Sequence, residues 1–185
     1  ARVSDAGEYQ RKLEDAMQTD PATGFLHRRY FVDKLHERLA QPVKGGVRCL
    51  AYVEADKFDA VHEELGVLAG EDFLTDFARL LKEQVQPGDL AGRFGGHGFM
   101  LLIERGNTQD VEAWAEHVVH KVATEVFQAG PKSLSTTCTV GLGRVPPEVK
   151  LEAIRGLSFF EDIALALPNY GYGASNLAER GNEER

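Results

Sequence analysis

Apolar residues recur along this chain with two periods, and each period predicts a type of element. Spacing of three to four residues, together with Gly and Pro breakers, predicts helices at 28–40, 57–64, 70–85, 108–127 and 157–167. Compact apolar runs rich in β-branched and aromatic residues predict strands at 47–55, 90–94, 99–104 and 134–145. Strands and helices should therefore alternate along the chain.

The segment Gly95-Gly96-His97-Gly98 separates two of the predicted strands. Its glycines permit the positive backbone angles of a tight hairpin. Alternating strands and helices can build a parallel sheet, but a tight hairpin requires antiparallel neighbours. We therefore expect an α/β protein, an α+β sandwich in which a central mixed or antiparallel sheet of about five strands is flanked by helices.

The ends of the chain differ from its middle. Residues 5–18 are polar and favour a helix, with Tyr9, Leu13 and Met17 forming a narrow apolar seam. Such a seam is typical of a connecting helix rather than a core helix. A chain of 185 residues suits one compact domain with an extension. The predicted division is a connecting signalling helix, one domain and a polar tail or linker, at 1–19, 20–176 and 177–185.

Charge and hydropathy narrow the classes of partner. The chain has 21 Lys and Arg against 29 Asp and Glu, a formal net charge of -8, so nucleic acid is not expected as a partner. Its longest apolar runs, such as 99–103, are far shorter than the roughly 20 residues that span a bilayer. We expect a soluble, cytoplasmic domain without membrane contact of its own. Cys49 and Cys138 should be reduced residues of buried strands.

Four segments resemble, in the same order, the motifs of the GGDEF family of bacterial diguanylate cyclases. They are DPATGFLHRRYF at 20–31, VEADKFDAVHEELGVLAGEDFL at 53–74, RFGGHGF at 93–99 and TCTVGL at 137–142. The resemblance covers about 20–176 and implies a central sheet flanked by helices, related to polymerase palms and class III nucleotidyl cyclases. It also implies the family's activity, in which the two domains of a dimer join two GTP molecules into cyclic di-GMP.

The resemblance also marks positions where this chain departs from the family's catalytic residues. The family's first metal-binding Asp falls on Glu54, which is longer by one methylene, so at most a weak Mg²⁺ site is implied. The signature acid falls on Gly98, and the Asp before it falls on His97. A Lys that meets phosphate becomes Asp59, which repels a triphosphate. The degenerate active-site positions are therefore Glu54, Asp56, Asp59, Gly95, Gly96, His97, Gly98 and Phe99.

Alternatives stay open for several of these residues. Glu54 and Asp56 are either remnants of a metal site or a solvated strand end. His97 is either a metal ligand or base, or a surface residue of the hairpin turn. Arg28 and Arg93 either meet an anion or a partner or pair with a carboxylate of the same domain, and we expect the pairing.

The resemblance further marks nucleotide and inhibitor positions. The family's guanine-binding Asn and Asp fall on His62 and Glu71, and Glu71 can still accept hydrogen bonds from guanine. The family's inhibitory R-x-x-D motif reads QPGD from Gln86 to Asp89. It lacks the arginine that would clamp cyclic di-GMP, so feedback binding is not expected there.

These departures predict a domain that is not an enzyme. The cations that the family places near its last helix are replaced by Asn169 and Gly173. We expect a catalytically inactive regulatory or interaction domain of cyclic di-GMP signalling, without metal or cofactor. Its expected partner is an adjacent EAL-type phosphodiesterase domain or another signalling protein, and a homodimer is compatible with the sequence. Two alternatives remain: a GTP-binding allosteric module that controls the EAL-type domain, and a weakly active diguanylate cyclase that uses GTP and Mg²⁺.

Overall fold

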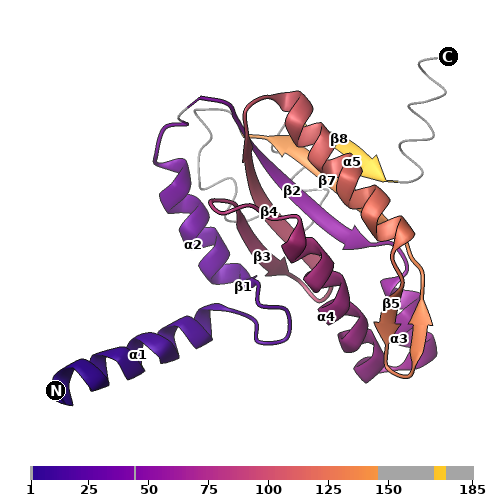
Figure 1. The fold of residues 1–185 in the computed structure, drawn as a ribbon, viewed down its shortest axis with the longest axis horizontal. Coiled ribbons are helices and arrows are strands. Elements are labelled where there is room, and N and C mark those ends of the chain that lie inside the picture. Colours follow the sequence, from indigo (N-terminus) through magenta and orange to yellow (C-terminus); the bar gives the residue numbers. More distant parts are fainter. Residues whose placement is uncertain (1, 44, 146–168, 174–185) are drawn as a thin grey trace.

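The computed structural model describes residues 2–43, 45–145 and 169–173 (Figure 1). Its elements in chain order are α1 (Arg2–Gln18), β1 (Leu26–His27), α2 (Arg28–Leu39), β2 (Val47–Ala55), α3 (Phe58–Leu65), α4 (Val67–Glu83), β3 (Leu90–Phe94), β4 (Gly98–Arg105), α5 (Thr108–Thr124), β5 (Phe127–Ala129), β6 (Lys132–Leu134), β7 (Cys138–Arg144) and β8 (Asn169–Gly173). The alternation of strands and helices agrees with the apolar periods of the sequence.

One mixed sheet organises the domain. Its strand order is β1-β3-β4-β2-β7-β8, with β2 antiparallel to both of its neighbours, β4 and β7. The predicted hairpin is present as the antiparallel pair of β3 and β4, whereas β1 pairs with β3 in parallel. The expected mixed sheet is thus confirmed, and the two-residue strand β1 adds a sixth strand at its edge.

Helices cover both faces of this sheet. Cys49, Ala51 and Val53 of β2 pack into the larger core with α4 and α5, while Leu50 joins a smaller core with Phe31 and other apolar residues under α2. Figure 1 shows α4 and α5 on one side of the sheet and α2 on the other. This arrangement follows from the strand period of two, which sends successive side chains of β2 to opposite faces.

Several predicted boundaries are wrong, and packing explains them. The helix predicted to begin at residue 70 begins at Val67, directly after Gly66, whose φ of 91° ends α3. The helix predicted to end at 127 ends at Thr124, because Phe127 is buried against Phe73 and Phe77 as part of β5. The strand predicted at 134–145 is divided between β6 and β7.

Several short strands differ from the prediction, and two predicted segments lie outside the described residues. The strands β1, β5 and β8 and the pairing of β5 with β6 were not expected from the sequence. The helix predicted at 157–167 and the tail at 177–185 lie outside the described residues. Asn169 and Gly173, which were expected near the last helix, lie in β8 and pair with Gly143 and Thr139 of β7.

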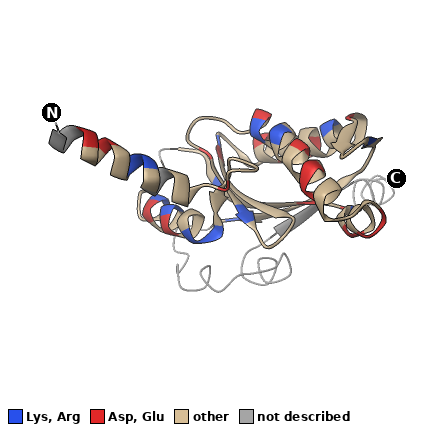
Figure 2. Cartoon of the chain, turned by 90° about the horizontal axis from the view of Figure 1, so that it is seen from below, with Lys and Arg blue, Asp and Glu red and all other residues tan. Residues whose placement is uncertain are grey.

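The first helix stands apart from the domain. Figures 1 and 2 show α1 projecting from the body, with acidic and basic segments along its length. Tyr9 and Met17 are 67% and 65% exposed, and Leu13 is 47% exposed. The apolar seam is therefore uncovered in the part of the chain that the structure describes. Among those residues, no helix combines the length and the apolar character that a bilayer crossing requires.

The burial of both cysteines predicts that their thiols react slowly with thiol reagents. Burial raises the pKa of the Cys49 thiol to about 11 and that of the Cys138 thiol to about 12, and the thiolate is the form that reacts. We expect almost no labelling of the native domain by Ellman's reagent at pH 8 and labelling of both thiols in denaturant. The variant Ser133→Cys, at an exposed position of β6, is the control that should react at once. Rapid labelling of both native thiols would contradict the prediction.

Candidate functional site

The end of β2 and the hairpin between β3 and β4 bring the predicted site residues together. In the antiparallel pair of β2 and β4, Glu54 lies directly opposite Gly98. Directly opposed residues project to the same face of a sheet. Position 98 is therefore a direct cross-strand neighbour of Glu54, and His97 precedes it in the turn.

His97 is paired with Glu54. Its Nε2 lies 2.6 Å from Oε1 of Glu54, and its ring stacks on Phe58 with the centroids 4.7 Å apart and the planes at 16°. The side chains of His97 and Glu54 are 29% and 41% exposed. His97 does occupy the turn, but its contacts with Glu54 and Phe58 distinguish it from a freely solvated turn residue.

The other acidic residues at this end of β2 have different surroundings. Asp56 accepts hydrogen bonds from the hydroxyls of Thr137 and Thr139, at 2.5 and 2.6 Å. Asp59 is exposed in the first turn of α3, where a negative charge is favourable for the helix dipole. Asp56 is exposed directly after β2 and is hydrogen-bonded to β7 and the loop before it.

The predicted guanine-binding residues lie on α3 and α4, near the pair formed by His97 and Glu54. His62 contacts Phe58, with ring centroids 5.9 Å apart, and a Cβ added to Gly70 would lie 3.4 Å from its ring. Oε1 of Glu71 lies 3.5 Å from Nη2 of Arg93. Both His62 and Glu71 are exposed, so either side chain is accessible to a ligand.

Arg93 connects three segments around the hairpin. Its guanidinium donates to Oδ2 of Asp20 at 2.9 Å and to the carbonyl of Gly96 at 2.8 Å. The expectation that Arg93 pairs with a carboxylate of its own domain is confirmed. Arg28 lies over the Phe94 ring, with its Cζ 5.3 Å from the centroid.

Asp20 is the buried partner in this arrangement. Burial alone would raise the pKa of its carboxyl, but hydrogen bonds from Thr23 and Arg93 and the charge of Arg93 together lower the pKa below its ordinary value. A carboxyl whose pKa is lowered in the folded state stabilises that state once it is ionised. Asp20 and Arg93 thus hold the segment after α1 against β3.

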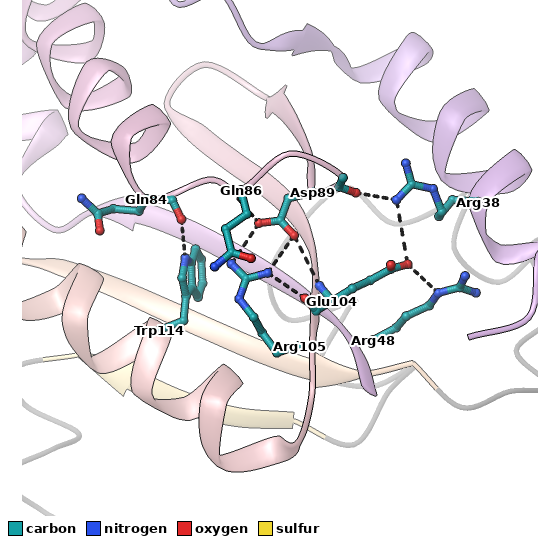
Figure 3. Close-up of polar contacts among 9 residues, drawn as sticks. Arg38, Arg48, Gln84, Gln86, Asp89, Glu104, Arg105 and Trp114 are labelled. Carbon is teal, nitrogen blue, oxygen red and sulfur yellow. Dashed lines mark hydrogen bonds and ion pairs between the residues drawn. The ribbon is translucent and has the colours of Figure 1, made fainter. Parts of the chain in front are cut away.

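The predicted inhibitory position is occupied by contacts within the domain (Figure 3). Asp89 accepts two hydrogen bonds from the guanidinium of Arg105, at 2.8 and 3.0 Å, and one from the backbone N–H of Gln86, at 3.0 Å. The Asp89 side chain is only 3% exposed. Arg38 donates to the carbonyl of Gly88 in the same turn. Asp89 therefore serves as a structural residue.

A neighbouring ion pair extends these contacts. Glu104 pairs with Arg48 at 2.7 Å, and Arg38 lies 3.9 Å from the same carboxylate oxygen. Arg48 also donates to the carbonyl of Gln41. Figure 3 shows these side chains converging from α2, β2 and β4. This end of the sheet is thus tied to the end of α2.

The donor set does not fit a magnesium site. Mg²⁺ is usually held through carboxylates together with phosphates or water. At the family's metal position this chain offers the carboxylate of Glu54, already paired with His97, and no side chain at Gly98. Within the described ranges, no group of three or more His, Cys, Asp or Glu residues is arranged to hold a metal ion.

The fold and this hairpin define an α/β domain of the GGDEF class, with a mixed sheet flanked by helices. Residues 17–156 match the family model described as the diguanylate cyclase GGDEF domain. The chain belongs to this family, and it is a domain of cyclic di-GMP signalling.

A curated relative supports this assignment, and solved structures share the fold. The chain is 30% identical to the diguanylate cyclase DgcP of Pseudomonas aeruginosa over 142 residues, which cover 75% of this chain and 21% of DgcP. It resembles the diguanylate cyclase SiaD of Pseudomonas aeruginosa, solved with its activator SiaC, with a TM-score of 0.70, 27% identity and coverage of 89% of this chain and 65% of SiaD. The coiled coil and GGDEF domain of DgcB from Caulobacter crescentus has been solved with cyclic di-GMP. Its TM-score with this chain is 0.75 and its identity is 20%, and the match covers 85% of this chain and 84% of the DgcB chain. The chain spans about a fifth of DgcP's length, so DgcP has further parts outside the match.

Replacing Asp20 by Asn should destabilise the domain in a pH-dependent way. Breaking a buried hydrogen-bonded pair costs about 1–3 kcal/mol, and we expect a loss of this size in urea unfolding at pH 7. The stabilisation from a lowered pKa is complete above the carboxyl's ordinary pKa and is lost as pH falls through the lower folded value. The difference between wild type and Asp20→Asn should therefore be constant from pH 7 to 5 and should shrink below about pH 4.

Asp33→Asn, at an exposed position of α2, is the matched control and should change stability little. An equal loss for both variants, or a loss for Asp20→Asn that does not change with pH, would contradict the assigned role of Asp20.

Proposed function

We propose that this chain is a catalytically inactive GGDEF domain that acts through interactions within cyclic di-GMP signalling. The observation that supports this most directly is the pairing at the signature hairpin. Position 98 carries no side chain, and the carboxylate of Glu54 opposite it is paired with His97. A metal would need a carboxylate at both positions. Only Glu54 supplies one, and that carboxylate is already paired with His97.

The chemistry of phosphoryl transfer explains why this arrangement is unsuited to catalysis. Such transfer depends on metal ions and cations that position the triphosphate and neutralise the charge that develops on it. Asp59 adds negative charge near the start of α3, where the family resemblance places a phosphate-binding lysine. Repulsion between Asp59 and an incoming triphosphate would weaken substrate binding further, beyond the effect of the missing metal ligand.

A role in interaction agrees with the exposed first helix and with a relative. SiaD has been solved with a protein activator, and the chain's apolar seam on α1 is exposed. We propose that the partner is an adjacent EAL-type phosphodiesterase domain or another signalling protein, with a second copy of the domain as a further candidate through α1.

A GTP-binding allosteric module is the second candidate function. It is favoured by Glu71, which keeps an acidic group at the family's guanine position and lies exposed beside His62 and the hairpin. A nucleotide held there would depend on base contacts and backbone donors rather than on Mg²⁺. Dependence on Glu71 without dependence on Mg²⁺ is therefore the signature of this alternative.

Calorimetric titration of the domain with GTP and Mg²⁺, followed by chromatography of the sample, tests the proposal. We expect no cyclic di-GMP, because the metal ligands are incomplete. A GGDEF domain with an intact signature, assayed in parallel, is the positive control. Production of cyclic di-GMP by this chain would refute the inactive assignment. Saturable binding without product, lost in Glu71→Gln but unchanged when Mg²⁺ is omitted, would establish the allosteric alternative.

A further inference from the structure

Tyr52 lies next to the position of the missing signature acid. It precedes Glu54 by two residues on β2, so both side chains project to the same face of the sheet. The register pairs Tyr52 with Met100 and Glu54 with Gly98. Tyr52 is therefore the diagonal neighbour of position 98, within reach of a long aromatic side chain.

The Tyr52 side chain occupies the space that a side chain at position 98 would need. A Cβ added to Gly98 would overlap the hydroxyl oxygen and Cζ of Tyr52, and even its third-nearest atom, Cε2, would be 2.9 Å away. Carbon atoms in favourable contact are roughly 3.5–4.0 Å apart. Glycine at position 98 is therefore required by the space that Tyr52 fills.

Backbone conformation does not account for this glycine. Gly95, in the same turn, has a φ of 62° and open space around its added Cβ among the described residues. Gly98 is instead the first residue of β4, and its φ is not positive. Gly95 and Gly98 are thus present for different reasons: Gly95 for its conformation and Gly98 for its lack of volume.

The Tyr52 ring is not free to swing away at little cost. It packs against the smaller core under α2, whose members include Phe31, Leu50 and Met100. Moving the ring would expose apolar surface and leave a void in this layer, and both effects are unfavourable.

We infer that Tyr52 is the specificity-determining residue of this site: its ring and hydroxyl exclude an acidic side chain from position 98 and so keep the hairpin from holding a divalent cation. The inference deepens the proposed function, since it concerns the same site, but its basis is steric. Tyr52 and Gly98 form a coupled pair, and restoring an acid at position 98 alone does not rebuild the metal site.

A thermodynamic cycle with Tyr52→Ala and Gly98→Ala tests the coupling. Overpacking is destabilising, so Gly98→Ala should lower the melting temperature of the wild-type domain by roughly 5 °C. In the Tyr52→Ala background the same substitution should leave the melting temperature unchanged or raise it. Gly96→Ala is the matched control, because an added Cβ there meets no described atom within 4 Å.

Equal losses from Gly98→Ala in both backgrounds would overturn the inference. If Gly98→Ala does not fold, recovery of folding in the double variant supports the inference. Failure of the double variant where Tyr52→Ala alone folds refutes it.

Manganese binding supplies a readout that does not depend on catalysis. The variant H97D/G98E restores both acids of the signature, and Y52A/H97D/G98E differs from it only at Tyr52. Electron paramagnetic resonance of free Mn²⁺ should show at least about tenfold tighter binding by the triple variant, corresponding to about 1.4 kcal/mol. Equal affinities would overturn the role of Tyr52. Synthesis of cyclic di-GMP by the unaltered chain would refute the inactive assignment. The steric coupling of Tyr52 and Gly98 is tested separately, by the thermodynamic cycle.

Discussion

The pairing of β2 with β4 is the constraint on which most of this domain depends. β2 lies inside the sheet and supplies side chains to both cores, with Ala51 and Val53 facing α4 and α5 and Leu50 facing α2. A shift of the register by one residue would move each of these side chains to the opposite face. The two hydrophobic layers therefore hold the register, and the register places Glu54 opposite Gly98.

Polar groups around the sheet are used largely for contacts within the domain. Glu54 pairs with His97, Asp89 pairs with Arg105, and Arg93 joins Asp20 to the hairpin turn. Asp20 and Arg93 are 73 residues apart in the sequence, so their pair links the segment after α1 directly to the signature hairpin. A carboxylate that is paired within the domain stabilises the fold and is correspondingly less available to a ligand.

The long elements and the class of fold were predictable because their apolar residues have a clear period. The seventeen residues of α4 carry most of their buried side chains at helical spacing, and β3 and β4 are bounded by glycines. The short strands β1, β5, β6 and β8 contain too few residues to show a period, and packing decides their conformation. Phe127 shows this well: by spacing it continues α5, but burial against Phe73 and Phe77 places it in a strand.

The sequence by itself determined the family motifs, the missing acid at Gly98 and the missing arginine at Gln86, because these are identities of residues at positions along one chain. It also indicated that Arg93 would meet a carboxylate, but not which one. Only the tertiary structure decided that Asp20 is that carboxylate, that Arg105 satisfies Asp89 and that Tyr52 fills the space beside Gly98. Such neighbours lie on separate strands and loops, and their contacts depend on a strand register and a packing of helices that no local pattern of residues records.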